Sequence, residues 1–342
     1  MKTVLSKDHR LHSPRGELAG GELIPPYECP QRWDYVVDAL RSRHLGELLE
    51  PQPLSMAGVQ AVHREGFVRF LSTAWQAWDE EGFKGDAIPT VFPARRMRQR
   101  EPDYIDGKLG YYCMAIETAI TAGTWIAACS SAAVAQSAQR LVANGERAAF
   151  ALCRPPGHHA ASDLYGGYCF LNNAAIATQA FVDGGASRVA VLDVDFHHGN
   201  GTQDIFFDRS DVLYLSLHGR PEDAFPHFSG YADETGAGAG EGFNQNYPLS
   251  RGIGFDSWAV ALEDACRRIE RYSPEALVVS LGVDTFERDP ISFFGLRTDD
   301  FSRYGERLSK LGLPTLFVME GGYAVEEIGI NTVNVLSGFE QG

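Results

Sequence analysis

The chain has 342 residues, of which 44% are hydrophobic and 22% are charged, a balance typical of a folded globular protein and not of a disordered one. Its formal net charge of −15 argues against nonspecific nucleic-acid binding, because that binding depends on Lys and Arg contacts to phosphates. No stretch resembles a membrane span or the apolar core of a secretion signal. Six cysteines without a CxxC pair favour a reducing setting, so we expect a cytoplasmic protein without nucleic-acid or membrane partners.

The chain shows an alternation of helical and strand-like patterns. The predicted helices cover residues 31–43, 57–80, 114–143, 170–184, 256–271, 299–312 and 324–337. The predicted strands are apolar runs at 148–153, 188–194, 212–217, 276–283 and 315–320. This pattern predicts an α/β fold in which residues 1–342 form a single domain, with a central, mostly parallel sheet flanked by helices.

Two segments do not fit this alternation. The stretch "GELAGGELIPP" (16–26) has the composition of a loop, and residues 82–111 contain three prolines and four arginines without clear periodicity. A connection of about 30 residues without structure is unusual in a domain and tends to serve a function or an interface. The alternative is a solvated surface excursion.

Each predicted strand runs into polar or glycine-rich residues at its carboxyl end. Because ligands of open α/β sheets bind outside these ends, we expect one shared site. The five sequences are "RPPGHHA", "DFHHGNG", "HGRPEDAFP", "DTFERDP" and "GGY".

The stretch "VLDVDFHHGNG" (191–201) carries candidate metal ligands. In a continuous strand, Asp193, Asp195 and His197 would project from one face. A catalytic zinc commonly takes three protein ligands, and Asp284, at the end of another buried strand, is a third candidate beside Asp195 and His197. Any one of these residues could instead be a helix cap or a satisfied core histidine. Their recurrence at buried strand ends favours a metal, since unpaired buried charges are costly.

Two further strand ends carry candidate catalytic groups. His158 and His159 follow a Pro-Pro-Gly turn, and a neutral histidine is suited to activating a water molecule. Tyr323 follows two glycines and could donate a hydrogen bond to a developing oxyanion. Taken singly, an incidental histidine pair and a packed tyrosine are the simpler interpretations.

The motifs "RPPGHHA", "DVDFHHGNGTQ", "SLGVDTFERDP" and "MEGGY", in this order, resemble those of the zinc-dependent histone deacetylase family of the arginase–deacetylase superfamily. Within it the chain is similar over nearly its whole length to the bacterial acetylpolyamine amidohydrolases. The resemblance implies the arginase–deacetylase fold and hydrolysis of an acetamide.

The resemblance also implies a role for each catalytic residue. His159 would be the general base and then the general acid, with His158 as its electrostatic neighbour, held by Asp193. Tyr323 would stabilise the oxyanion together with zinc. Asn200 would orient His159, whereas many class I histone deacetylases carry aspartate there. An amide supports an imidazolium less than a carboxylate does, so we expect a lower acid–base pKa.

Two metal sites are implied by the same resemblance. The residues Asp195, His197 and Asp284 would bind zinc, although Fe²⁺ can also occupy such a mixed nitrogen and oxygen site. A structural potassium ion would be held by Asp193, together with Ser216 and the backbone carbonyls of Asp195, His197 and Leu217.

Relatives of the polyamine type are homodimers in which the inserted loop, here 82–111, narrows the neighbouring active-site tunnel. The resemblance places Glu17 and Glu117 near this tunnel as acidic residues, with Tyr168 and Phe225 in its apolar lining. On pattern alone, Glu117 could equally be an exposed helix residue.

Three functions remain open from the sequence. The first is hydrolysis of acetylated polyamines such as acetylputrescine, acetylcadaverine and acetylspermidine-like substrates, with release of acetate and free amine. The second is deacetylation of acetyl-lysine in proteins by the same chemistry. The third is a non-catalytic, metal-binding regulatory protein. The 82–111 segment and the acidic balance favour the first.

Overall fold

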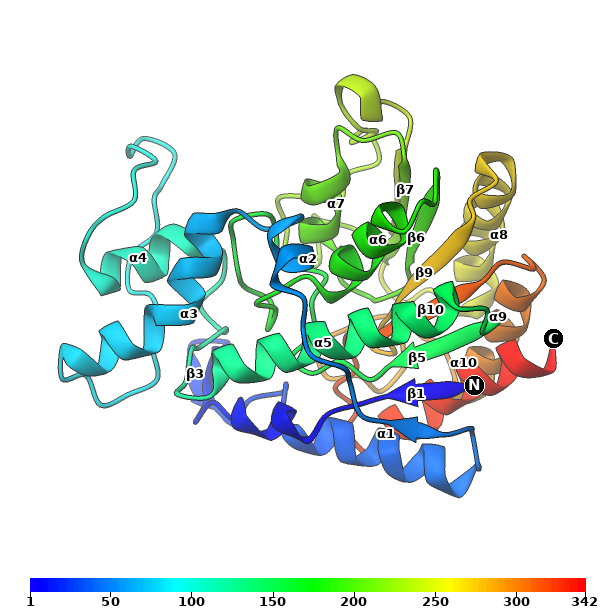
Figure 1. Cartoon of the computed structure of the whole chain (residues 1–342), viewed down its shortest axis with the longest axis horizontal. Coiled ribbons are helices and arrows are strands. Elements are labelled where there is room, and N and C mark those ends of the chain that lie inside the picture. Colours follow the sequence, from blue (N-terminus) through cyan, green and yellow to red (C-terminus); the bar gives the residue numbers. More distant parts are fainter.

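The computed structural model describes residues 1–342 and is built around an eight-stranded sheet with helices on both faces (Figure 1). The strand order is β4-β1-β5-β10-β9-β6-β7-β8, and every pairing in this sheet is parallel. This architecture confirms the predicted fold class. The strands are β1 (Lys2–Val4), β4 (Leu48–Leu49), β5 (Ala148–Ala151), β6 (Val189–Asp193), β7 (Val212–Gly219), β8 (Asn244–Leu249), β9 (Ala276–Leu281) and β10 (Thr315–Met319).

The helices form layers on the two faces of the sheet, and none of them is long and apolar enough to cross a membrane. Helices α5 and α6 cover one face, while α1, α8, α9 and α10 cover the other (Figure 1). The α-helices are α1 (Pro30–Ser42), α2 (Met56–Gln60), α3 (Glu65–Glu80), α4 (Ile105–Tyr112), α5 (Thr124–Ala143), α6 (Asn173–Asp183), α7 (Asn200–Phe206), α8 (Phe255–Tyr272), α9 (Thr298–Ser309) and α10 (Ile328–Gln341).

The central strands are buried on both faces, which is why they read as continuous apolar runs. Along β5, Ala149 packs into the core under α5 and α6, and its neighbour Phe150 packs into the core on the opposite face. Val278 and Val279 of β9 alternate in the same way. Because successive side chains of a strand point to opposite faces of the sheet, the same strands contribute residues to both cores.

Several boundaries differ from the prediction because tertiary contacts override local pattern. The predicted helix 57–80 is broken between α2 and α3, where the backbone N–H of Arg64 donates to the carbonyl of Ser162. The predicted helix 114–143 begins only at Thr124, because residues 113–120 make β-bridges to Tyr165 and Ala87 instead.

The two segments described as loops are partly structured. Residues 16–26 contain an antiparallel hairpin of β2 (Glu17–Ala19) and β3 (Glu22–Ile24), so the expectation of a loop there is wrong. The segment 82–111 ends in helix α4, and its remainder projects away from the sheet together with α3 (Figure 1). The expectation of a wholly structureless connection is therefore also wrong.

The stability of this fold should depend on pH through buried histidines such as His63. Its Nδ1 lies 2.9 Å from the carbonyl oxygen of Ala161, and its Nε2 accepts the backbone N–H of Asn172 at 2.9 Å. Both contacts are satisfied only by the neutral ring, and burial lowers the pKa of His63 to about 4. Below an unfolded-state pKa of about 6.5, the unfolded chain binds a proton that the folded chain does not, so stability is lost as pH falls toward 4.

Urea unfolding at about pH 7 and about pH 5.5 measures this effect. We expect the wild-type protein to lose about 1 kcal/mol more of unfolding free energy across this interval than a His63→Gln variant. An identical loss in both proteins would contradict a neutral, non-titrating His63 in the folded state.

Candidate active site

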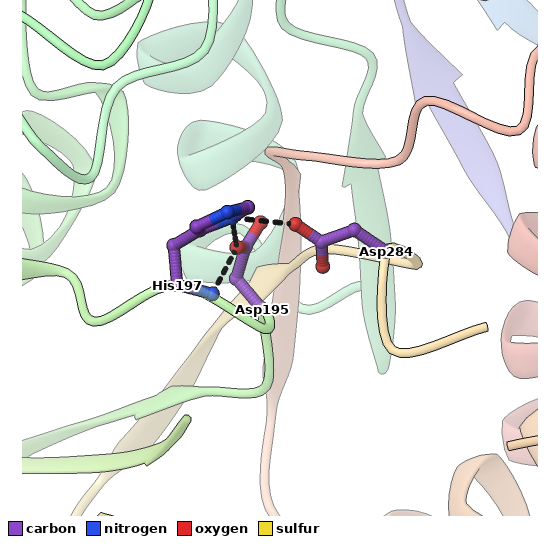
Figure 2. Close-up of side chains that lie close together, drawn as sticks. All are labelled: Asp195, His197 and Asp284. Atoms are coloured by element: carbon purple, nitrogen blue, oxygen red, sulfur yellow. Dashed lines mark hydrogen bonds and ion pairs between the residues drawn. The ribbon is translucent and has the colours of Figure 1, made fainter. Parts of the chain in front are cut away.

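Three potential metal ligands converge beyond the carboxyl ends of β6 and β9 (Figure 2). One ligand atom from each of Asp195, His197 and Asp284 lies within 4.8 Å of the others, and all three residues are buried. The Nδ1 atom of His197 is 2.9 Å from a carboxylate oxygen of Asp284 and 3.3 Å from one of Asp195. The structure therefore brings together the three residues predicted as zinc ligands.

The surrounding backbone holds the two carboxylates in place. The N–H of Gly321 donates to Asp195 at 2.8 Å, and the N–H of Phe196 donates to Asp284 at 2.7 Å. A Cβ atom at Gly282 or Gly321 would lie 2.0 or 2.6 Å from the Asp195 carboxylate. Glycine at both positions is what lets these backbone segments approach the ligands so closely.

The charges of the three residues suit a divalent cation. Burial, followed by the neighbouring Asp195, raises the pKa of Asp284 to about 8, although His197 acts in the opposite direction. Two carboxylates and one neutral imidazole balance a charge of +2, and zinc accepts this donor set. The site thus fits a metal ion by its chemistry.

Asp193 lies behind this cluster and does not join it. Strand β6 ends at Asp193, so the strand alternation that would put it on one face with Asp195 and His197 does not continue. An oxygen of Asp193 lies 3.0 Å from Nδ1 of His158 and accepts the hydroxyl of Tyr214 at 3.1 Å. The expectation of three ligands on one strand face is corrected, and Asp284 completes the group.

The two histidines of "RPPGHHA" lie side by side with opposite electrostatic surroundings. Burial lowers the pKa of His158, but Asp195 and Asp193 outweigh it and raise this pKa to about 10. Burial, followed by His158 and His197, holds the pKa of His159 well below its ordinary value. A pair of adjacent groups with pKa values pushed apart is a common basis for assigning acid and base roles.

Asn200 contacts His159, and three of the residues predicted for the potassium site adjoin one another on β6 and β7. Nδ1 of His159 is 2.7 Å from Oδ1 of Asn200, the first residue of α7. Asp193 of β6 and Ser216 of β7 are paired across the sheet, with Leu217 next along β7. The hydroxyl of Ser216 lies 2.8 Å from Nδ1 of His218.

Tyr323 is held by contacts from three directions. Its backbone N–H donates to the buried carboxylate of Asp289 at 2.7 Å. The guanidinium of Arg32 lies 4.8 Å from the centre of the phenol ring and donates to the carbonyl of Gly322 at 2.7 Å. The ring of Tyr168 lies 5.6 Å away on another side. The phenol is thereby fixed near the three potential ligands.

A cavity of about 450 Å³ leads to these residues, and His159, His197 and Tyr323 form part of its wall. All four residues predicted for the tunnel also line it, namely Glu17, Glu117, Tyr168 and Phe225. Its wall contains a further acidic residue, Asp223, and one basic residue, Arg251.

The two predicted tunnel glutamates are fixed in different ways. The carboxylate of Glu17, on β2, accepts the hydroxyl of Tyr168 at 3.0 Å, and burial raises its pKa to about 6. Glu117 lies in the loop before α5 and accepts the N–H of Gly167 at 2.8 Å. The alternative of an exposed helix residue at Glu117 is therefore wrong.

Sequence reasoning missed several residues that shape this site. Asp289 and Arg32 hold the Tyr323 loop, and Tyr214 donates to Asp193. Glu320 contacts the histidine turn. Two of them were visible as charges beside recognised motifs, Asp289 in "DTFERDP" and Glu320 in "MEGGY".

Residues 26–339 match the family model described as "Histone deacetylase domain", and the chain belongs to the histone deacetylase family, whose members are metal-dependent hydrolases. Among curated proteins, the chain is similar to acetylpolyamine amidohydrolase 2 of Pseudomonas aeruginosa, with 59% identity across 99% of each chain. It is 53% identical to the acetylpolyamine amidohydrolase of Mycoplana ramosa, again across 99% of each chain.

Among solved structures, the fold is similar to that of an acetylpolyamine aminohydrolase from Burkholderia pseudomallei. The TM-score is 0.94 at 39% sequence identity, and the match covers 99% of this chain and 98% of that chain. The similarity therefore extends over the whole sheet and its helices, including the strand ends that carry the site.

Proposed function

We propose that this protein hydrolyses the acetamide of acetylated polyamines, such as acetylputrescine, acetylcadaverine and acetylspermidine-like substrates, and releases acetate and the free amine. The observation that carries this proposal is the cavity, which combines Glu17, Glu117 and Asp223 with the residues of the site in one wall. A slender cationic chain is complementary to such a wall. The names of the most similar relatives support the same substrate class.

In this proposal Asp195, His197 and Asp284 hold the metal ion, as zinc or Fe²⁺, which when bound supplies a positive charge that polarises the amide carbonyl. His159 removes a proton from the attacking water, because its ring is buried and neutral. The phenol of Tyr323 donates a hydrogen bond to the oxyanion as the carbonyl carbon becomes tetrahedral.

The remaining residues support these steps. His158, whose Nδ1 lies 3.0 Å from an oxygen of Asp193, is the electrostatic neighbour of His159. His159 then returns its proton to the nitrogen of the leaving amine, which allows the carbon–nitrogen bond to break. Asn200 orients His159 through the contact at its Nδ1. Because an amide supports the imidazolium weakly, we expect the acid–base pKa to be lower than with aspartate at this position.

A structural potassium ion and a homodimer are also part of the proposal. Asp193, Ser216 and Leu217, adjacent on β6 and β7, would contribute to the potassium site. Support for the dimer comes from the 82–111 segment, in which Val91, Met97 and Tyr104 are each at least half exposed. The six cysteines are all unpaired, which supports a reducing, cytoplasmic setting.

Steady-state hydrolysis by the zinc-loaded protein tests this function. We expect kcat/KM for acetylputrescine, acetylcadaverine and N8-acetylspermidine to exceed that for an acetyl-lysine peptide by about 10²-fold or more, because the acetyl-lysine side chain lacks the ammonium at the far end of these substrates and brings a bulky backbone to the cavity mouth. A preference for the peptide would favour a protein deacetylase with the same chemistry. The absence of turnover on all amides would favour a non-catalytic protein.

A further inference from the structure

A fully buried carboxylate contacts the backbone of the catalytic histidine turn. Glu320 follows the last residue of β10 and is 0% exposed. Its Oε2 atom accepts the backbone N–H of Gly157 at 2.7 Å and that of His158 at 3.1 Å. Its other oxygen, Oε1, has no hydrogen-bond partner.

These two contacts are the only hydrogen bonds that the N–H groups of Gly157 and His158 make. Both residues are buried and belong to no helix or strand. A buried N–H without a partner loses its hydrogen bond to water and gains none in return, which is unfavourable. The turn would therefore be free to rearrange toward other acceptors if the Glu320 oxygen were withdrawn.

The four residues that begin with Glu320 contact each part of the site. The carboxylate of Glu320 contacts the histidine turn, the N–H of Gly321 donates to Asp195, and Tyr323 follows two residues later. Arg32 fixes this segment by donating to the carbonyls of Glu320 and Gly322. Residues 320–323 thus contact both the histidine turn and a predicted metal ligand, and they also carry the phenol of Tyr323.

We propose that Glu320 is a positioning residue for the reaction: it accepts the two N–H groups of the histidine turn and so sets the place of His159 relative to Asp195 and Tyr323. The proposal rests on the function proposed above. Glu320 acts through the reach of one oxygen atom and not through its charge, because both hydrogen bonds end on Oε2. A glutamine can supply the same oxygen, whereas an aspartate is shorter by one methylene and withdraws it by about 1.5 Å.

Two variants distinguish the length of the Glu320 side chain from its charge: Glu320→Gln keeps the length and removes the charge, whereas Glu320→Asp keeps the charge and shortens the side chain. We expect Glu320→Gln to retain kcat for acetylputrescine within about tenfold, and Glu320→Asp to lose about 10²-fold in kcat, since misplacement by about 1 Å costs this much. KM should change little in either variant, because Glu17 and Glu117 are untouched. Zinc content and melting temperature are measured alongside. Glu327→Gln and Glu327→Asp are the controls, because Glu327 lies four residues beyond this segment, at the start of α10, and pairs with Arg288.

Backbone amide exchange over residues 154–160 gives a readout independent of activity. Exchange at Gly157 and His158 should stay slow in Glu320→Gln and accelerate in Glu320→Asp. Equal kcat in the two variants, or the reverse order, would overturn the proposal, as would unchanged exchange in Glu320→Asp. If Glu320→Asp does not fold, fast exchange or a large loss of kcat in Glu320→Gln overturns it. A wild-type protein inactive on every acetylpolyamine refutes the proposed function, and the exchange result then still decides whether Glu320 holds the turn.

Discussion

Replacing His159 with alanine is expected to reduce turnover of acetylputrescine by roughly 10³-fold or more while metal content stays near that of the wild-type protein. The expected loss is large because the proposed mechanism uses this one ring both as base and as acid, and each role contributes 10²-fold or more. His159 is not one of the three clustered ligand residues, and its ring centre lies 6.1 Å from that of His197. Metal binding should therefore survive the change.

The measurement combines kcat with zinc quantification of the purified variant. His44→Ala is a suitable control, since His44 is exposed and does not line the cavity. Turnover equal to that of the wild-type protein would remove His159 from the mechanism. A loss of zinc together with activity would instead give His159 a structural role at the metal site.

Replacing Tyr323 with phenylalanine is expected to lower kcat by about 10²-fold or more, the typical effect of removing one oxyanion donor. The ring should keep its place, because Tyr168 and Arg32 pack against it and Asp289 holds its backbone N–H. KM should change little, since the hydroxyl acts mainly in the transition state.

Steady-state kinetics with acetylputrescine and zinc quantification check this result. Tyr35→Phe serves as the control, because Tyr35 is 41% exposed and lies outside the cavity wall. Retained kcat in Tyr323→Phe would show that the phenol is not the oxyanion donor. A large rise in KM with unchanged kcat would indicate a role in substrate binding alone.

The sequence predicted the parts of the fold whose burial leaves a clear pattern. The five neighbouring strands from β5 to β7 in the sheet order are buried on both faces and appear in the sequence as apolar runs. Strands β1 and β4 have three and two residues, too few for any periodicity, and β8 has the polar sequence "NQNYPL". The hairpin at 17–24 did carry a signal, since Gly20 and Gly21 form a two-residue turn that such hairpins favour.

The candidate site was predictable to the extent that its side chains lie directly after strands. Asp195, His197, Asp284, His159 and Tyr323 follow four different strands of one sheet, so parallel topology alone brings them to the same edge. Residues that act through backbone contacts could not be assigned in this way. The partners of Glu320 and Asp289 are N–H groups of other loops, and their positions exist only once the chain has folded.

The position of β10 in the middle of the sheet affects how the chain folds. The last strand in sequence pairs with β5 on one side and β9 on the other, so the centre of the sheet stays open until residues 315–319 have been synthesised. Contacts between such distant segments make folding slow. Until β10 has been synthesised, β5 and β9 each have an unpaired apolar edge, and such edges promote association with other chains. A C-terminal truncation before β10 should therefore aggregate during expression, and metal binding should be among the last properties that a refolding chain acquires.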